Sequence, residues 1–227
     1  NDSHLFKTEP GEGRLPLYEG KYFYQFDANY GKPKYWLDEN QARFNLLSPR
    51  LKQIKNAFSG LETDINFDEI KIHLDYESYR LAFRDVARNT DEGTFIGTIL
   101  PPNRFCPHTV SLEKVFFDTV EKNAPVYNCT HLNNRERLFL LAILNSFVAD
   151  YLLRQRVTAH VSFFFVYNLP VPRLNSLDPT FTPIVTRAAR LTCTTPEFDD
   201  LAKQVGLTSH TEGVTDPIER ARLRAEL

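Results

Sequence analysis

Two Cys-x-His pairs are the first residues in this sequence whose types and spacing could support chemistry. Cys106 and His108 form one pair, and Cys129 and His131 form the other. Two cysteines and two histidines are an established set of zinc ligands. Their spacing, however, is not the usual spacing of zinc ligands, and two such pairs can arise by chance in loop segments near strand ends. We therefore expect no metal in this chain, and a zinc site at these four residues is the alternative.

Basic side chains are the second candidate group, because they can bind DNA phosphates and arginine can also bind guanine edges. Four arginines lie in or near one predicted hairpin: Arg80, Arg84, Arg88 and Arg104. Lys52 and Lys55 lie on a predicted helix. The residues that we expect to contact DNA are Arg80, Arg88, Arg104, Lys52 and Lys55. The alternative is a solvated strand face whose arginines pair with local acids such as Asp85 and Asp91.

An aromatic run, residues 163–165 followed by Tyr167, could stack on nucleic-acid bases. A buried strand is the more common structure for such a run, and we expect one here. Signatures of catalysis are missing from the sequence. It has no glycine-rich phosphate loop, no Gly-x-Ser-x-Gly, no His-Glu-x-x-His and no Asn-Pro-Pro-aromatic motif. The residues therefore favour binding over catalysis.

The composition limits the class of protein. The 227 residues include 27 basic and 29 acidic side chains, so the net charge of −2 gives no argument for nucleic-acid binding. Hydrophobic residues make up 42%, which is typical of a globular fold, and no apolar run reaches the roughly 20 residues of a membrane helix. Three cysteines are too few for a disulfide framework, which favours a cytoplasmic location. Because the chain starts at Asn1 and lacks Met, we expect a fragment or a processed protein.

Periodicity and turn residues predict an α+β fold, a twisted and mainly antiparallel sheet flanked by helices, with a helical C-terminal extension. Predicted strands cover residues 21–27, 35–37, 79–90, 94–100, 110–117 and 162–167. The third and fourth of these form the predicted hairpin. Predicted helices cover 39–47, 49–58, 138–153, 183–192, 197–205 and 217–227. Asp38 caps the first helix and Ser48 the second, while Asn133 and Glu136 form a capping box before the third.

Four sequence blocks, in order, resemble one family. The first has LYEGK at 17–21 and QFD at 25–27, and the second is Tyr35-Trp36. The third has YRLAFRDVAR at 79–88 and TFIGTILPP at 94–102. The fourth has LNSF at 144–147, DYLLRQ at 150–155 and NLPVP at 168–172. The chain resembles the C-terminal target-recognition region of adenine-specific DNA methyltransferases of type IIG-like restriction–modification enzymes and phage-exclusion systems.

This resemblance implies recognition of double-stranded DNA. The methyl-transfer half of the family is missing from the sequence, so the resemblance implies no enzyme activity and no cofactor in this fragment. S-adenosylmethionine would bind an upstream methyltransferase domain of the same chain, with or without endonuclease activity in the parent enzyme. Arg84 and Asp85 lie in the recurring third block, which indicates a structural role for both. Base-reading residues vary within the family, so the resemblance does not assign them here.

The expected organisation has three parts. Residues 1–14 form a linker or lead-in, 15–175 the target-recognition domain, and 176–227 a helical extension that ends without a stop signal. The rival to DNA recognition is a protein–protein or regulatory module associated with such enzymes. In either case we expect no membrane insertion.

Overall fold

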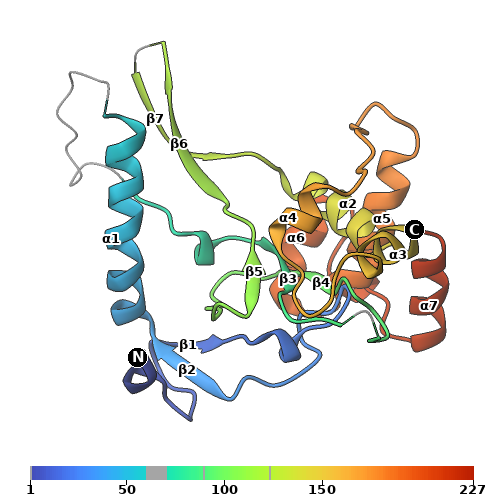
Figure 1. Cartoon of the computed structure of the whole chain (residues 1–227), viewed down its shortest axis with the longest axis horizontal. Coiled ribbons are helices and arrows are strands. Elements are labelled where there is room, and N and C mark those ends of the chain that lie inside the picture. Colours follow the sequence, from blue (N-terminus) through green and yellow to red (C-terminus); the bar gives the residue numbers. More distant parts are fainter. Residues whose placement is uncertain (1, 60–70, 89, 123) are drawn as a thin grey trace.

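Three small antiparallel sheets and seven α-helices form the described part of the chain, which in this computed structural model comprises residues 2–59, 71–88, 90–122 and 124–227 (Figure 1). β1 (Arg14–Leu17) pairs with β2 (Tyr35–Asp38). β3 (Arg80–Arg84) lies between β4 (Gly97–Leu100) and β5 (Val110–Leu112). β6 (Phe116–Glu121) and β7 (Ala124–Thr130) form a hairpin. The predicted α+β class is confirmed, with the strands divided among three sheets.

One of the α-helices precedes the central sheet in the sequence, and the other described α-helices follow it. The α-helices are α1 (Glu39–Ala57), α2 (Asn134–Leu144), α3 (Phe147–Arg154), α4 (Phe163–Tyr167), α5 (Phe181–Thr192), α6 (Asp199–Gln204) and α7 (Pro217–Ala225). Short 3-10 helices cover Asp2–Leu5, Gly20–Tyr22, Asp75–Glu77, Pro196–Phe198 and His210–Glu212. None of the helices within the described ranges has the length and apolar character needed to cross a bilayer.

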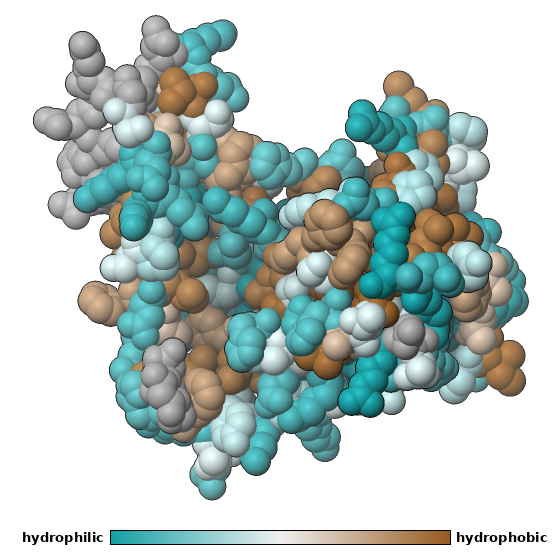
Figure 2. Space-filling view, viewed as in Figure 1, coloured by the Kyte–Doolittle hydropathy of each residue, from teal (hydrophilic) through white to brown (hydrophobic). Residues whose placement is uncertain are grey.

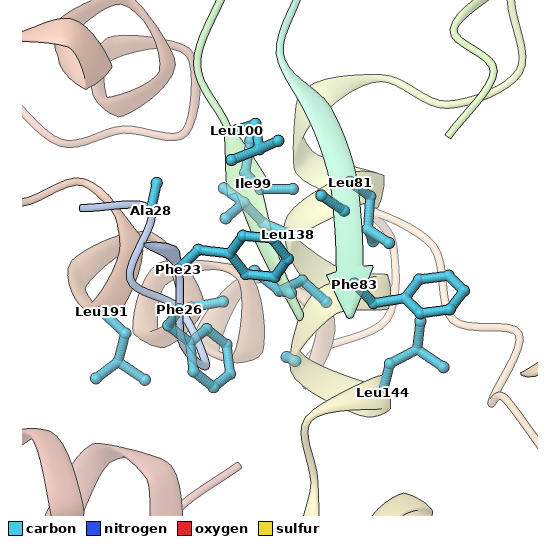
Figure 3. Close-up of a cluster of buried hydrophobic side chains, with 14 of the residues drawn as sticks. Phe23, Phe26, Ala28, Leu81, Phe83, Ile99, Leu100, Leu138, Leu144 and Leu191 are labelled. Carbon is cyan, nitrogen blue, oxygen red and sulfur yellow. The ribbon is translucent and has the colours of Figure 1, made fainter. Parts of the chain in front are cut away.

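The larger of the two hydrophobic cores contains side chains from the central sheet and from most of the helices. We call the part of the molecule built around this core the body. β3 and β4 direct Leu81, Phe83 and Ile99 into this core, where they meet Leu138 and Leu144 of α2 (Figure 3). Phe23 and Phe26 enter the same core from the segment after Gly20–Tyr22. Because these side chains are at most 6% exposed, the central sheet is fixed on α2 by a close-packed interior.

The C-terminal helices belong to this same core. Phe181 and Val185 of α5, Leu201 of α6 and Leu223 of α7 are each at most 2% exposed and pack in the body. The region from residue 176 onward is helical, as expected for the extension. Its buried side chains nevertheless belong to the same hydrophobic core as buried side chains from between residues 18 and 161. Residue 175 therefore does not mark a boundary between two hydrophobic cores.

The second assembly of elements, which we call the arm, consists of α1, the β6–β7 hairpin and residues 71–77 beside them. Figure 1 shows α1 and the hairpin side by side, away from the helices of the body, with β1 and β2 at the lower edge. A smaller hydrophobic cluster, which includes Leu37, Leu74 and Tyr76, packs where β2 and residues 71–77 meet. The predicted lead-in takes part here, because the backbone of Lys7 exchanges two hydrogen bonds with Trp36.

Several local predictions were confirmed. Asp38 Oδ1 accepts a hydrogen bond from the Gln41 backbone and so caps α1. Asn133 and Glu136 form the reciprocal capping box at the start of α2, with distances of 3.0 and 2.8 Å. β3 and β4 pair with each other as predicted, but the strand predicted at 79–90 ends at Arg84 and the strand predicted at 94–100 begins at Gly97, so a long loop and not a tight turn joins them. Residue 89 of the predicted strand lies outside the described ranges.

Two helix predictions were wrong in their boundaries. Residues 39–57 form one helix, with Pro49 inside it, because Arg50 and Ile54 are buried beyond the proline and keep the axis continuous. The helix predicted at 138–153 is two helices. The side chain of Asn145 interrupts it by hydrogen bonding to both backbone groups of Gly97, and Ser146 caps α3.

Three strand predictions were wrong. Residues 21–27 form a 3-10 turn and a tight loop, in which the backbones of Tyr24 and Asp27 hydrogen bond to each other instead of to another strand. The strand predicted at 110–117 stops at Leu112, because Asp75 Oδ1 accepts the N–H groups of Val115 and Phe116 and draws the chain out of the central sheet. The aromatic run predicted as a strand is the helix α4.

Candidate nucleic-acid interface

A hollow separates the arm from the body at the upper edge of the molecule (Figure 2). Within the arm, a buried ion pair joins α1 to β6. The side chains of Arg50 and Asp118 are 7% and 2% exposed, and Arg50 Nη2 lies 2.9 Å from Asp118 Oδ1. Phe58 and Tyr127 add an edge-to-face ring contact with centroids 5.1 Å apart. These contacts make α1 and the hairpin one rigid unit.

Lysine dominates the exposed charge of the arm and of the short segment that leads into β6. Its exposed basic residues, within the described ranges, are Lys52, Lys55, Lys71, Lys114 and Lys122. Among the described residues of the same region, Glu121 is the only exposed acidic residue. The other acids there are engaged, for example Glu77 with Arg43 and Glu113 with Arg137. Residues 60–70, which lie outside the described ranges, add the acids Glu62, Asp64, Asp68 and Glu69 to the sequence.

Burial and two neighbouring cations lower the pKa of a histidine in the arm. The pKa of His73 is lowered from its usual value, mainly by burial and further by the charges of Lys71 and Arg43. This happens although Glu77 Oε2 lies 3.4 Å from His73 Nδ1, so the neighbouring carboxylate does not reverse the effect. His73 therefore adds no stable positive charge near neutral pH.

Of the five residues predicted to contact DNA, Lys52 and Lys55 lie exposed on α1, and Arg88 lies exposed in the loop after β3. Arg88 bonds to Asp91 through its backbone N–H, at 2.8 Å. No ion pair of the Arg88 guanidinium occurs among the described residues, so it is available to an anion. Arg88 belongs to the body, whereas the two lysines belong to the arm. The structure therefore does not bring all the exposed predicted residues together.

Arg80 and Arg104 are placed differently from the prediction. Arg80 is 4% exposed and donates a hydrogen bond to the Arg104 carbonyl oxygen, and burial lowers its pKa. The alternation of Arg80 with Leu81 is typical of a half-solvated strand, but the segment that contains Arg104 covers that face. Arg104 itself pairs with Glu197 at 2.8 Å and lies over the ring of Tyr18. Neither arginine is therefore part of the candidate interface.

Arg84 and Asp85 have structural contacts. Arg84 donates to the Phe23 carbonyl oxygen and lies over the rings of Phe23 and Tyr24. The carboxylate partner expected for Arg84 is not found among the described residues. Asp85 Oδ2 lies 2.8 Å from His160 Nδ1, and its backbone N–H donates to the Thr109 carbonyl oxygen. Both residues thus join β3 to neighbouring segments.

The zinc alternative gains no support from the structure. Cys106 packs against the core of the body, and burial raises the pKa of its thiol to about 11. The His131 ring stacks on Phe117, with centroids 3.8 Å apart, instead of facing a cysteine. Within the described ranges, which include Cys106, His108, Cys129 and His131, no three histidine, cysteine, aspartate or glutamate residues are grouped as metal ligands.

Sequence reasoning missed two features of the interface. Lys71, Lys114 and Lys122 are scattered in the sequence, and the hairpin that was not predicted carries Lys122 and begins directly after Lys114. The aromatic run was assigned to a buried strand, but Phe164 and Tyr167 of α4 are 71% and 80% exposed. Figure 2 shows hydrophobic atoms in the region of α3 and α4, beside the hollow. Exposed apolar side chains that form a contiguous patch are a feature of many binding surfaces.

Comparison with known proteins adds no assignment to these observations. No protein-family model matches the chain, and no curated protein matches it significantly.

Proposed function

We propose that this chain recognises double-stranded DNA as the sequence-reading module of a restriction–modification adenine methyltransferase. The observation that carries the proposal is the exposed charge of the arm and of the segment that leads into β6, where five exposed lysines outnumber a single exposed glutamate among the described residues. The resemblance of the four sequence blocks supplies the enzyme class. Methyl transfer, and S-adenosylmethionine with it, would belong to an upstream domain of the same chain in the cytoplasm.

The lysines of the arm would bind phosphate oxygens. A lysine ammonium is a compact point charge without the planar fork of arginine, so it positions DNA without reading its sequence. Base edges would then be read by other groups beside the hollow. This division explains how a near-neutral chain can bind a polyanion, because phosphate contacts need individual exposed lysines at the contact surface and not an excess of positive charge over the whole chain.

The test is a fluorescence-anisotropy titration with mixed-sequence duplex DNA at several salt concentrations. We expect Lys52→Ala and Lys122→Ala each to weaken binding on all sequences and to lower the salt slope by about one unit. The matched control is Lys32→Ala, because Lys32 is also exposed but precedes β2 at the opposite edge of the molecule. Wild-type protein without measurable binding at low salt, or arm variants that behave like the control, would refute the proposal.

A second candidate function, a protein-binding module, is favoured by α3. Phe147, Val148 and Tyr151 of this helix are 68%, 69% and 64% exposed. Apolar side chains at positions i, i+1 and i+4 share one helix face, and water contact with such a face is unfavourable. Sedimentation over a range of protein concentrations tests it. Self-association that Val148→Asp abolishes, together with unchanged DNA affinity in that variant, would support the second function.

A further inference from the structure

A pocket lies on the side of the body that borders the hollow. Its volume is about 830 Å³, which is in the range of small-molecule sites. The floor is formed by Leu81, Phe83 and Leu144, which are at most 6% exposed. Figure 3 shows Phe83 and Leu144 adjacent at this end of the sheet. His131 lines the pocket from the segment that joins the hairpin to α2, so the pocket lies where arm and body meet.

Aromatic rings rise from the floor of the pocket to its rim. Phe83 and Phe163 are in edge-to-face contact at 5.2 Å, and Phe163 and Tyr167 are tilted by 30° at 5.5 Å. Phe163 is 38% exposed, and Tyr167 at the end of the series is 80% exposed. The buried ring of Phe83 therefore contacts the partly exposed ring of Phe163, which in turn contacts the largely exposed ring of Tyr167. A flat ring system that enters the pocket can stack on this series.

Three polar groups are placed around the aromatic rings. Glu113 is fixed by Arg137, whose Nε lies 2.9 and 2.8 Å from its two carboxylate oxygens. Glu113 Oε2 also accepts a hydrogen bond from the Leu81 backbone. Among the described residues Oε1 accepts no second hydrogen bond, although a carboxylate oxygen can accept two. One acceptor position in the pocket is thus held in place for an N–H donor.

Lys114 and Arg173 supply positive charge to the same pocket. Both side chains are exposed, and neither forms an ion pair within the described part of the chain. Aromatic rings, one fixed acceptor and two uncommitted cations correspond to the chemistry of a nucleotide unit, with a flat base that carries N–H donors and a phosphate on each side. A purely apolar ligand would use neither the cations nor the carboxylate.

We propose that this pocket binds an unpaired base of a DNA strand, with the base stacked on Tyr167 and Phe163 and its N–H facing Glu113. Lys114 and Arg173 bind the flanking phosphates. The inference rests on the proposed function, since it assumes that DNA is the natural ligand. It adds that this surface engages a base that has left its partner, whereas the arm engages the intact duplex.

The experiment compares three fluorescent probes with the full chain: an oligothymidylate, an abasic strand of equal length, and a matched duplex. Oligothymidylate and the abasic strand have the same phosphate charge and differ only in their bases. We expect the thymidylate to bind at least about tenfold more tightly. Tyr167→Ala should abolish this difference without changing the affinity for the abasic strand. Lys114→Ala should weaken both single strands equally.

Two further variants are controls for the effect of Tyr167→Ala. Tyr30→Ala removes another exposed tyrosine, which is 63% exposed and lies outside the pocket, and should behave as wild type. Tyr167→Trp keeps a large ring and should keep the preference for bases, which excludes a general effect of altering α4. A 2-aminopurine base in the strand gives an independent signal, because stacking on Tyr167 should quench its fluorescence in the wild type and not in Tyr167→Ala.

Each outcome decides between the proposals. Equal affinity for thymidylate and abasic strands, or a Tyr167→Ala variant that keeps the preference, overturns the pocket assignment even if the duplex binds. A preference for bases without duplex binding supports the pocket and overturns duplex recognition. Displacement of thymidylate by an acidic tyrosine-containing peptide at equal concentration would show that the pocket takes aromatic side chains of a protein, and would overturn the assignment to a base.

Discussion

The ion pair that holds the arm gives a prediction with a defined magnitude. In Arg50→Ala, the Asp118 carboxylate, whose side chain is 2% exposed in the intact protein, loses its charged partner. It retains the Asn128 N–H at 3.1 Å and loses both of its hydrogen bonds from the guanidinium. Leaving one member of a buried pair without its partner costs about 3–5 kcal/mol. We expect a loss of this size in the free energy of unfolding.

The matched control is on the same helix. Arg43 pairs with Glu77, but these side chains are 38% and 26% exposed, so solvent screens the interaction. Arg43→Ala should cost about 0–1 kcal/mol. The double variant Arg50→Met with Asp118→Leu removes both buried charges and should recover most of the stability lost in Arg50→Ala. This comparison separates the burial of an unpaired charge from the loss of packing.

Urea unfolding followed by circular dichroism measures the global effect. Hydrogen exchange of the β6 and β7 amides measures whether the arm opens before the body unfolds. If Arg50→Ala lost less than about 1 kcal/mol and left exchange of these amides unchanged, the ion pair would not hold the arm. The account of the arm as a rigid unit would then be wrong.

Three further predictions concern the body. Asn145→Ala leaves the buried N–H and C=O of Gly97 without their partners and should cost about 1–3 kcal/mol for each group in urea unfolding, whereas Asn168→Ala, at an exposed site, should change little. Leu144→Ala truncates a side chain that is 2% exposed and should lower stability by about 2–5 kcal/mol, so an unchanged unfolding midpoint would place α2 outside the core. The hydrogen bonds from the backbone and ring of His210 lower the pKa of Asp199, so the stabilisation is fully present above the unfolded-state pKa of about 3.9 and is lost as pH falls through the lower folded-state pKa. Carboxyl NMR should show Asp199 titrating below its usual pKa, and titration at or above the usual value would contradict this account.

Features encoded by neighbouring residues were predictable from the sequence. Asn133 and Glu136 are three residues apart, and the capping box requires only that local spacing. The pairing of β3 with β4 was predictable because alternation and turn residues lie in one stretch. The α+β class follows from many such local signals together.

Features that depend on distant residues were not predictable. The interruption after α2 requires Asn145 to meet Gly97, which lies 48 positions away. Arg80 has the alternation of a half-exposed strand, and only the later segment at Arg104 buries it. The lysines of the arm were incompletely identified for the same reason, since a hairpin that was not predicted carries Lys122 and places the others nearby. A sequence pattern indicates the periodicity of apolar and polar positions along an element. It does not indicate which distant segment packs over a given side chain.

The shared core of the body has a consequence for how the chain folds during synthesis. Gln25 contacts Arg224 across 199 positions, and the Tyr79 hydroxyl reaches the Glu197 carbonyl oxygen across 118. The ribosome must therefore release the chain as far as Arg224 before Gln25 can make this contact. Until then the core around Phe23 and Phe26 lacks its neighbours from the C-terminal helices, and contacts of such high sequence separation form slowly.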